Sequence, residues 1–284
     1  MTDKTATLLT RIAEALERLA PPPIAAPRFD HARLFRFEPS RQDGAADRFI
    51  AAPDYSLALD LLMGVERQKG QFTQNLSRFA QGVPSNHVLL WGSRGAGKSS
   101  LSKAAFMAVG AECASLRMVE IDRDDIAALP RLFEDLRGRD ERFVVLCDDL
   151  SFEEGAAAAK SLKSALEGGV AGPPANVLFV ATSNRRHLMP RHHDERGDPM
   201  ARAEDAEEEV SVSDRFGLWI GFPPMDQPAY LAALEAYAAR FDLRVDDLER
   251  RALQWSQRRG ARSGRVAWQF IRDLAGELGK PLPM

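Results

Sequence analysis

The sequence predicts an α/β protein with five strands, followed by a small all-helical region. Short apolar runs alternate with helical patterns between residues 88 and 222, as in βαβ units. A glycine-rich octet separates the first of these strands from its helix. Beyond Pro223 and Pro224, apolar residues recur only at helical spacing, which predicts helices at 227–240, 246–259 and 263–278.

The glycine-rich stretch carries the strongest chemical signal. Residues 88–91 form an apolar strand, residues 92–99 fit the P-loop motif G-x-x-x-x-G-K-[ST], and a helix follows. The backbone N–H groups of such a loop, with the positive end of the helix, surround a phosphate. We expect Lys98 to reach the β- and γ-phosphates and Ser99 to bind Mg²⁺. The predicted nucleotide-binding residues are Gly92, Ser93, Arg94, Gly95, Ala96, Gly97, Lys98, Ser99 and Ser100.

Two later strands end in polar residues. The apolar run 143–146 leads into Asp148 and Asp149, which is typical of a strand buried on both faces. We assign Asp148 to Mg²⁺, and a helix-capping aspartate is the alternative. The strand at 176–181 runs into Asn184, which is predicted to hold the attacking water or the γ-phosphate unless it only forms a turn.

The N-terminal part is less informative. Residues 1–20 have the apolar spacing of an amphipathic helix, which either packs on its own domain or docks a partner. Residues 21–51 begin with three prolines and are expected to be an irregular linker. From residue 52 to residue 81 the pattern is mostly helical with a break at Gly64. Gly64 and Val65 are candidates for the adenine side of the site, and a plain helix–helix turn is the alternative.

Composition sets limits on function. The 284 residues are 45% hydrophobic. Their net charge of −3 argues against a high general affinity for nucleic acid. The two cysteines favour a reducing compartment and exclude a zinc site built from cysteines. The sequence contains no run of eighteen apolar residues, so no membrane span is predicted, and no secretory signal is expected. We expect a cytoplasmic protein.

Two charged regions have less specific interpretations. Residues 191–209 contain eight Asp or Glu and are expected to be a solvated loop. His187, His192 and His193 lie around it, but their spacing matches no metal site. Residues 240–272 contain nine arginines and only four acidic residues. These helices are expected to meet nucleotide phosphates and solvent, with nucleic acid as the alternative.

Four strings together resemble a known family. They are LLWGSRGAGKSS (89–100), CDDLSFEEG (147–155), ATSNRRHL (181–188) and SDRFGLW (213–219). Over residues 52–279 the chain is similar to AAA+ ATPases, and within them to the family catalogued as domain of unknown function 815. The resemblance implies a three-layer P-loop NTPase with the P-loop strand in the middle of five parallel strands. It places the nucleotide-binding domain at 52–225 and a helical lid at 226–284.

The resemblance also implies roles for single residues. Asn184 matches the first sensor, Arg265 the second sensor in the lid, and Arg215 an arginine finger that reaches the neighbouring subunit of a homo-oligomer. Arg185 and Arg186 are rival candidates for the finger. Gly64 and Val65 match the adenine-side turn.

One position departs from the family pattern. Asp149 stands where most AAA+ enzymes have a glutamate that orients the attacking water. A displacement of about an ångström there costs on the order of a hundredfold in rate. Glu153 and Glu154 are close enough in sequence to substitute.

The leading hypothesis is an ATPase that uses Mg²⁺ and drives conformational change in a homo-oligomer. Its partner would be an unidentified protein or, less favoured, nucleic acid. The alternative is a slow ATP-gated switch or loader that recruits a partner with little turnover. A P-loop kinase explains the lid less well, and no Asn-Lys-x-Asp string supports a GTPase.

Overall fold

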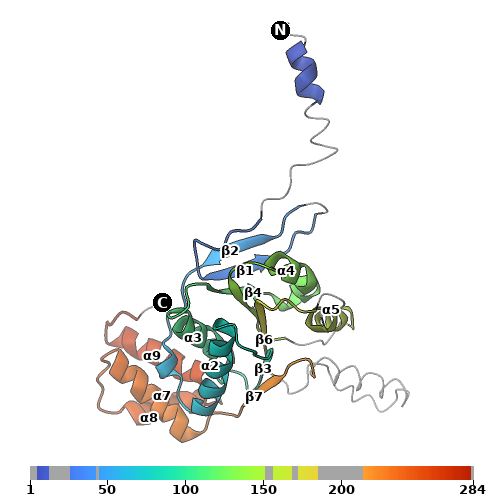
Figure 1. Ribbon diagram of the computed structural model, residues 1–284. Coiled ribbons are helices and arrows are strands. Elements are labelled where there is room, and N and C mark those ends of the chain that lie inside the picture. Colours follow the sequence, from blue (N-terminus) through green and yellow to red (C-terminus); the bar gives the residue numbers. More distant parts are fainter. Residues whose placement is uncertain are drawn as a thin grey trace, which may run out of the picture.

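The computed structural model describes residues 5–12, 26–42, 45–150, 156–167, 172–184 and 214–282. Over these ranges an α/β body carries a helical lid (Figure 1). The body contains a seven-stranded sheet in the order β2-β1-β4-β5-β6-β3-β7. The strands are β1 (Leu34–Glu38), β2 (Arg48–Ala52), β3 (Val88–Gly92), β4 (Leu116–Ile121), β5 (Arg142–Cys147), β6 (Val177–Ser183) and β7 (Leu218–Phe222).

The five predicted strands are all present, but the sheet is larger than predicted. β1 and β2 come from the segment that was expected to be an irregular linker. β1 pairs in parallel with β4, and β2 closes this edge antiparallel to β1. Phe35 and Phe37 are each only 1% exposed, so the segment belongs to the core. Each of its two strands is only five residues long and includes at least one charged residue. The sequence therefore shows no clear alternation of apolar and polar residues there.

The position of the P-loop strand also differs from the expectation. β3 lies between β6 and β7, and β7 is the last strand on that side of the sheet. The strand before the P-loop therefore lies next to an edge and not in the middle. The three-layer architecture itself is confirmed.

Helices cover both faces of the sheet (Figure 1). On one face α4 (Leu129–Leu136) and α5 (Ala156–Glu167) pack over alternate strand residues such as Leu89 and Val145. On the other face α2 (Glu66–Ala80) and α3 (Lys98–Gly110) cover the intervening residues such as Leu90. Two short 3₁₀ helices, η1 (Leu59–Leu61) and η2 (Arg123–Ala128), complete the body. Burial on both faces explains why the central strands read as continuous apolar runs.

The C-terminal lid has a core of its own. It consists of α7 (Gln227–Arg240), α8 (Leu248–Arg259) and α9 (Gly264–Glu277), close to the predicted helices. Tyr230, Phe270 and Ile271 are among its buried side chains, and Leu61 of η1 joins them from the body. The side chain of Asp226 caps α7 and that of Ser263 caps α9, which fixes where both helices begin.

The N-terminal helix is described only in part. Residues 5–12 are helical, with Leu8, Leu9 and Ile12 each more than half exposed. Several sequence predictions lie outside the described residues: the remainder of the 1–20 helix, Glu153, Glu154, Arg185, Arg186, the three histidines and the 191–209 segment. No helix in the described parts of the chain is long and apolar enough to cross a membrane.

Candidate nucleotide-binding site

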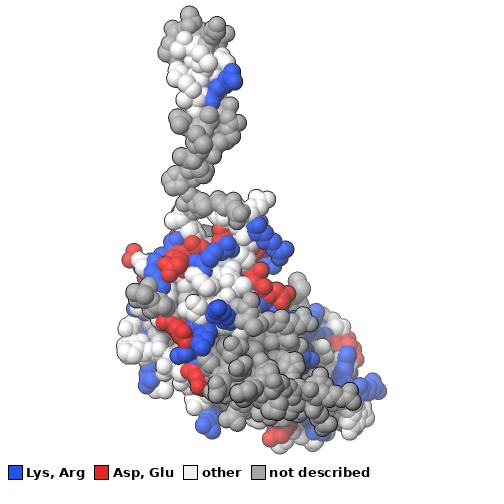
Figure 2. Space-filling view, turned by 90° about the vertical axis from the view of Figure 1, so that its right-hand side faces the viewer, with Lys and Arg blue, Asp and Glu red and all other residues white. Residues whose placement is uncertain are grey.

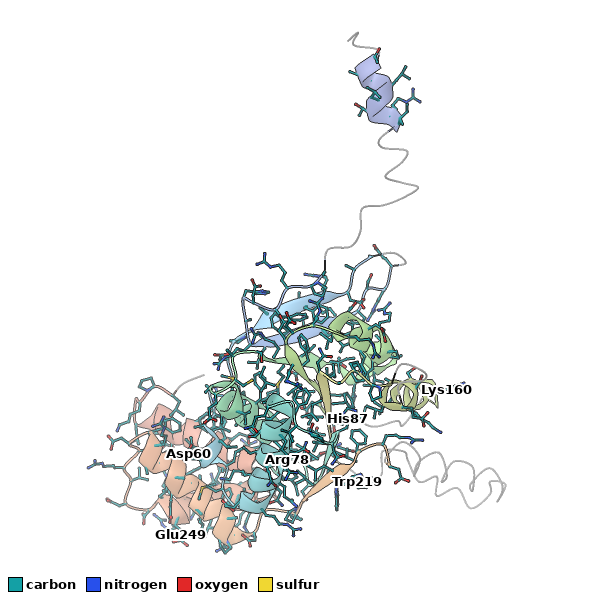
Figure 3. All side chains as sticks on the ribbon, viewed as in Figure 1. Asp60, Arg78, His87, Lys160, Trp219 and Glu249 are labelled. Atoms are coloured by element: carbon teal, nitrogen blue, oxygen red, sulfur yellow. The ribbon has the colours of Figure 1, made fainter. Side chains whose placement is uncertain are left out.

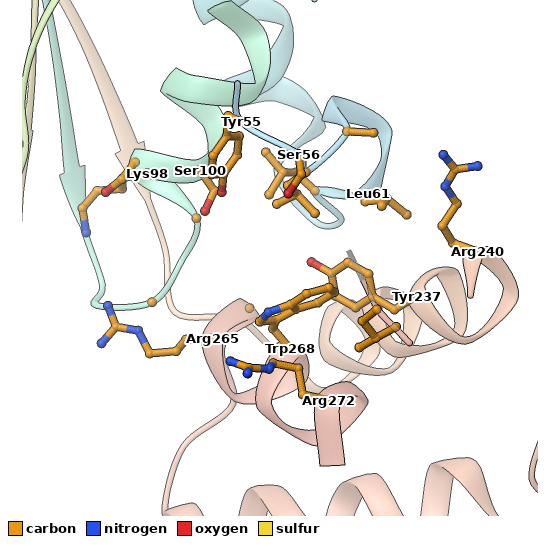
Figure 4. A pocket seen from close by; sticks show the side chains of 18 of the residues that line it. Tyr55, Ser56, Leu61, Lys98, Ser100, Tyr237, Arg240, Arg265, Trp268 and Arg272 are labelled. Atoms are coloured by element: carbon orange, nitrogen blue, oxygen red, sulfur yellow. The ribbon is translucent and has the colours of Figure 1, made fainter. Parts of the chain in front are cut away.

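A cavity of about 1130 Å³ lies between the carboxyl edge of the sheet and the lid (Figure 4). Its inner end is formed by the P-loop and by polar residues after β5 and β6. Its outer end is formed by residues 55–58, by Leu61 and Leu62, by α7 and α9, and by Lys280 and Leu282. This size and mixed lining are typical of a small-molecule site at a junction between two units.

Glycine is required at two turns of the P-loop. The φ of Gly92 is 129°, and a Cβ there would lie 2.1 Å from the carbonyl oxygen of Phe222. Gly97 has a φ of 92° and immediately precedes the first residue of α3. Only glycine adopts such angles without strain, so the loop can turn sharply and start α3 beside the cavity. The positive end of α3 then faces the space where phosphates would bind.

Lys98 is the central cation of the inner end. It is 7% exposed, and its ammonium donates to the carbonyl oxygens of Gly92 and Ser93 at 2.9 Å each. It also donates to Oδ1 of Asn184 at 3.1 Å. Burial lowers the pKa of Lys98, while the nearby Asp148 and Asp149 carboxylates oppose that shift. The loop carbonyls therefore hold the ammonium in place at the cavity wall.

An oxygen-rich cluster lies next to Lys98. The hydroxyl groups of Ser99 and Thr182 each donate to Oδ1 of Asp148 at 2.5 Å. Hydroxyl and carboxylate oxygens are the donors that Mg²⁺ prefers, and Mg²⁺ on a nucleotide takes only one or two ligands from the protein. Among the described residues no group of three or more His, Cys, Asp or Glu forms a metal cluster. The pair of Ser99 and Asp148 therefore fits Mg²⁺ that is shared with phosphates.

Asp149 is held by three neighbours. Its backbone N–H donates to Oγ1 of Thr182 at 2.9 Å, and its φ of 54° is unusual for a residue with a side chain. The side-chain amide of Asn184 donates to its carboxylate, and Nη1 of Arg123 lies 3.7 Å away. Asn184 thus links Asp149 to Lys98. In this arrangement the carboxylate has protein partners in addition to solvent.

The lid touches the P-loop directly. A Cβ on Gly95 would lie 2.9 Å from Oγ of Ser263 and 3.5 Å from Cβ of Arg265. Ser263 accepts the N–H of Val266, so the first turn of α9 is fixed at this contact. Arg94 and Arg265 both line the cavity here. The structure therefore places Arg265 beside the P-loop, and its role as second sensor stays a prediction.

Two sets of predicted residues lie elsewhere. Gly64 and Val65 do not line the cavity: Gly64 packs against Ala229 of α7, and Val65 is the N-cap residue of α2 and is buried at 7% exposure. Arg215 is also outside the cavity and pairs with Glu167 at the C-terminal end of α5. Since β3 and β7 are parallel and in register, Arg215 lies at the amino edge of the sheet, opposite the P-loop.

The sequence analysis missed several residues of the site, of which all but Arg123, a neighbour of Asp149, line the cavity. Thr182 was visible as a polar residue at the tip of an apolar strand, but Asn184 was chosen there. Arg123 follows β4 and carries no motif. The aromatic lining residues Tyr55, Tyr237 and Trp268 come from three separate segments, so only the fold brings them together.

Comparison with known families decides the identity of the chain. Residues 30–278 match the model of the family described as "Protein of unknown function (DUF815)". The chain belongs to this family. The match begins before β1, so the DUF815 unit includes the two additional strands. No curated protein sequence is significantly similar to the chain.

Solved structures show that this DUF815 protein has the AAA+ fold. RuvB, the Holliday junction branch migration motor of Thermotoga maritima, aligns with a TM-score of 0.54 at 19% identity, over 78% of this chain and 66% of RuvB. The Aeropyrum pernix ORC1 protein, solved in complex with DNA, gives 0.56 at 16% identity, over 78% and 64%. The chain thus spans about two thirds of the length of each. At such low identity the likeness concerns the fold alone.

Proposed function

We propose that this protein binds ATP with Mg²⁺ in the cavity between sheet and lid and hydrolyses it within a homo-oligomer. The observation that carries the proposal is the convergence of Lys98, Ser99, Asp148 and Asn184 at one end of the cavity. P-loop, carboxylate and polar strand tip are the parts that position and neutralise a triphosphate. Arg94 and Arg265 add positive charge from the loop and the lid.

Each residue has a defined task in this proposal. Lys98 binds the terminal phosphates, and Ser99 and Asp148 would hold Mg²⁺, which neutralises phosphate oxygens. Asp149 and Asn184 orient the attacking water, and Asp149 is placed to accept its proton. Arg265 binds the phosphates from the lid, so loss of the γ-phosphate changes how the lid is held. Arg215 completes the site of the next subunit.

The second candidate function is an ATP-gated switch with slow turnover. Asp149 is shorter than the usual glutamate, and its carboxylate is engaged by Asn184 and Arg123. Both facts favour a site that holds ATP for long periods. In either case we propose a macromolecular partner, and a protein is favoured over nucleic acid. Acidic and basic side chains are interspersed over the described part of the face in Figure 2.

The arginines of the lid support the same preference. Arg244, Arg250 and Arg251 pair with carboxylates of the lid itself. Three others line the cavity, namely Arg240, Arg265 and Arg272. Most of the basic excess predicted for these helices is therefore neutralised locally or directed to the nucleotide site.

The proposal is tested by measuring ATP binding and steady-state ATP hydrolysis over a range of protein concentrations. We expect Lys98→Ala to weaken ATP binding at least about tenfold, because the ammonium is the central phosphate contact. Arg258→Ala, an exposed change on α8 outside the cavity, is the matched control. Specific activity that rises with concentration supports an oligomeric ATPase. Tight ATP binding with negligible hydrolysis at every concentration supports the switch, and equal ATP binding by Lys98→Ala and wild type would refute both.

A further inference from the structure

The outer end of the cavity has a composition that phosphate binding does not explain. It contains three aromatic side chains that line the cavity, Tyr55, Tyr237 and Trp268, together with the apolar Leu61 and Leu62. The lining carboxylates, Asp148 and Asp149, lie at the inner end. An aromatic wall without carboxylates is suited to a flat heterocycle attached to an anion.

Three long side chains of helix α9 line the cavity in a row. Arg265, Trp268 and Arg272 follow the i, i+3, i+7 spacing that places side chains on one helix face. Figure 4 shows the two arginines on the lid side of the cavity, with Trp268 beside them and Lys98 across from Arg265. Seven residues of helix span about 10 Å, so the row reaches well beyond the terminal phosphates. A nucleotide bound along it would have its nucleoside near Trp268 and Arg272.

The ring of Trp268 is held firmly in this position. Tyr237 meets it at 5.3 Å between ring centroids with an interplanar angle of 67°, and Phe241 meets it at 5.8 Å and 63°. Such edge-on neighbours fix the plane of the indole. Burial raises the pKa of Tyr237 to about 12, so its hydroxyl stays neutral at physiological pH. Trp268 is therefore a preformed platform in the cavity wall.

Arg272 is available for a ligand. Other lid arginines form ion pairs, such as Arg250 with Asp247 and Arg251 with Glu277. Arg272 is exposed and forms no ion pair with any residue that the structure describes, although it lines the cavity. A cation one turn beyond an aromatic platform can contact the ribose or the edge of the base of a nucleotide.

We propose that Trp268 and Arg272 form a nucleoside subsite in which the base stacks on Trp268 and Arg272 contacts the nucleoside beside it. The subsite makes the lid selective for purine nucleoside triphosphates over pyrimidine nucleotides, since a purine offers the larger stacking surface. Base recognition would then lie in the lid and not at the turn around Gly64, where the sequence analysis expected it. The inference rests on the proposed function, because it requires the triphosphate to bind at the P-loop.

Titrations of the full chain with Mg²⁺ and three ligands test the subsite: ATP, CTP and inorganic tripolyphosphate. We expect ATP to bind wild type more tightly than CTP. Trp268→Ala should weaken ATP binding about 10- to 100-fold, the usual effect of losing one base stack, and leave tripolyphosphate binding unchanged. Trp268→Phe, which keeps an aromatic ring, should retain ATP affinity within about threefold.

Arg272→Ala should weaken the binding of ATP more than the binding of tripolyphosphate. Gln269→Ala, on the same helix but outside the cavity lining, is the control.

The outcomes separate the inference from the proposed function. If wild type binds neither ATP nor tripolyphosphate, the proposed function fails and the subsite fails with it. If wild type binds ATP but Trp268→Ala binds it equally well, or if ATP and CTP bind alike, the subsite alone is refuted. A loss of tripolyphosphate binding in Trp268→Ala as large as the loss for ATP also refutes it, since the change then acts through the phosphate end.

Discussion

Asn184 connects the two charges that a P-loop ATPase must coordinate. Its carbonyl oxygen accepts from Lys98, and its amide donates to Asp149. A triphosphate at the P-loop would compete for Lys98, and the change would reach Asp149 through this one side chain. If the site hydrolyses ATP as proposed, the rate would depend on how Asn184 divides its two hydrogen bonds. The sequence alone identified Asn184 as polar at a strand tip, but its link to Asp149 required the structure.

His87 lies just before β3, at the amino edge of the sheet, and allows a test of how protonation affects stability (Figure 3). Its Nδ1 accepts the backbone N–H of Phe179 at 3.1 Å, so the ring is neutral, and burial lowers the pKa of His87 to about 4. The unfolded chain, with an ordinary histidine pKa near 6.5, then binds a proton more readily. Stability should fall as pH drops from about 6.5 to about 4, with a slope of at most about 1.4 kcal/mol per pH unit from this group.

The pH dependence of urea unfolding measures this contribution. His87→Asn keeps an acceptor for Phe179 and removes the titrating ring. The difference in unfolding free energy between wild type and this variant should shrink or reverse in favour of the variant as pH falls through that window. A difference that is constant between pH 7 and pH 4 would show that His87 does not titrate as described.

At the scale of elements, the sequence predicted the parts whose signal is local. The P-loop, the strand that precedes Asp148 and the three lid helices each carry their own motif or period, and all are present. The β1–β2 hairpin carries none, because its stability comes from contacts distant in sequence. Phe35 meets Phe29 edge-on at 5.0 Å, and Phe29 meets Phe143 of β5 at 4.8 Å. These contacts join the hairpin to the main sheet and could not be read from residues 34–52 alone.

The same contacts predict that the hairpin stabilises the whole body. Phe35 is 1% exposed, so Phe35→Ala should lower the unfolding free energy by about 3–5 kcal/mol, the usual cost of removing a buried phenyl ring. Val83→Ala, at a side chain 48% exposed, should change it by less than about 0.5 kcal/mol. Equilibrium unfolding followed by circular dichroism compares them. A loss for Phe35→Ala no larger than for Val83→Ala would mean that the hairpin is an independent appendage.

At the scale of the whole molecule, the positions of Arg215 and the cavity suggest an assembly. Arg215 lies at the amino edge of the sheet and the P-loop at the carboxyl edge, separated by strand β7, or more than roughly 13 Å. An arginine on one edge and the proposed phosphate site on the other are suited to head-to-tail contact between copies. Within one chain Arg215 pairs with Glu167, and both side chains are more than a third exposed. Such an exposed pair is weak enough to exchange for phosphate.

Mixing two inactive variants tests whether the site is shared between subunits. Lys98→Ala lacks the phosphate contact but keeps its Arg215, and Arg215→Ala keeps the P-loop but lacks the finger. Each alone should hydrolyse ATP at least about a hundredfold more slowly than wild type, as expected when one transition-state contact is removed. In an equal mixture, about a quarter of head-to-tail interfaces would unite an intact P-loop with an intact Arg215, so activity should recover to roughly that fraction. Recovery should vanish on dilution below the assembly concentration, and a mixture with no more activity than the sum of its parts would show that Arg215 does not act across subunits.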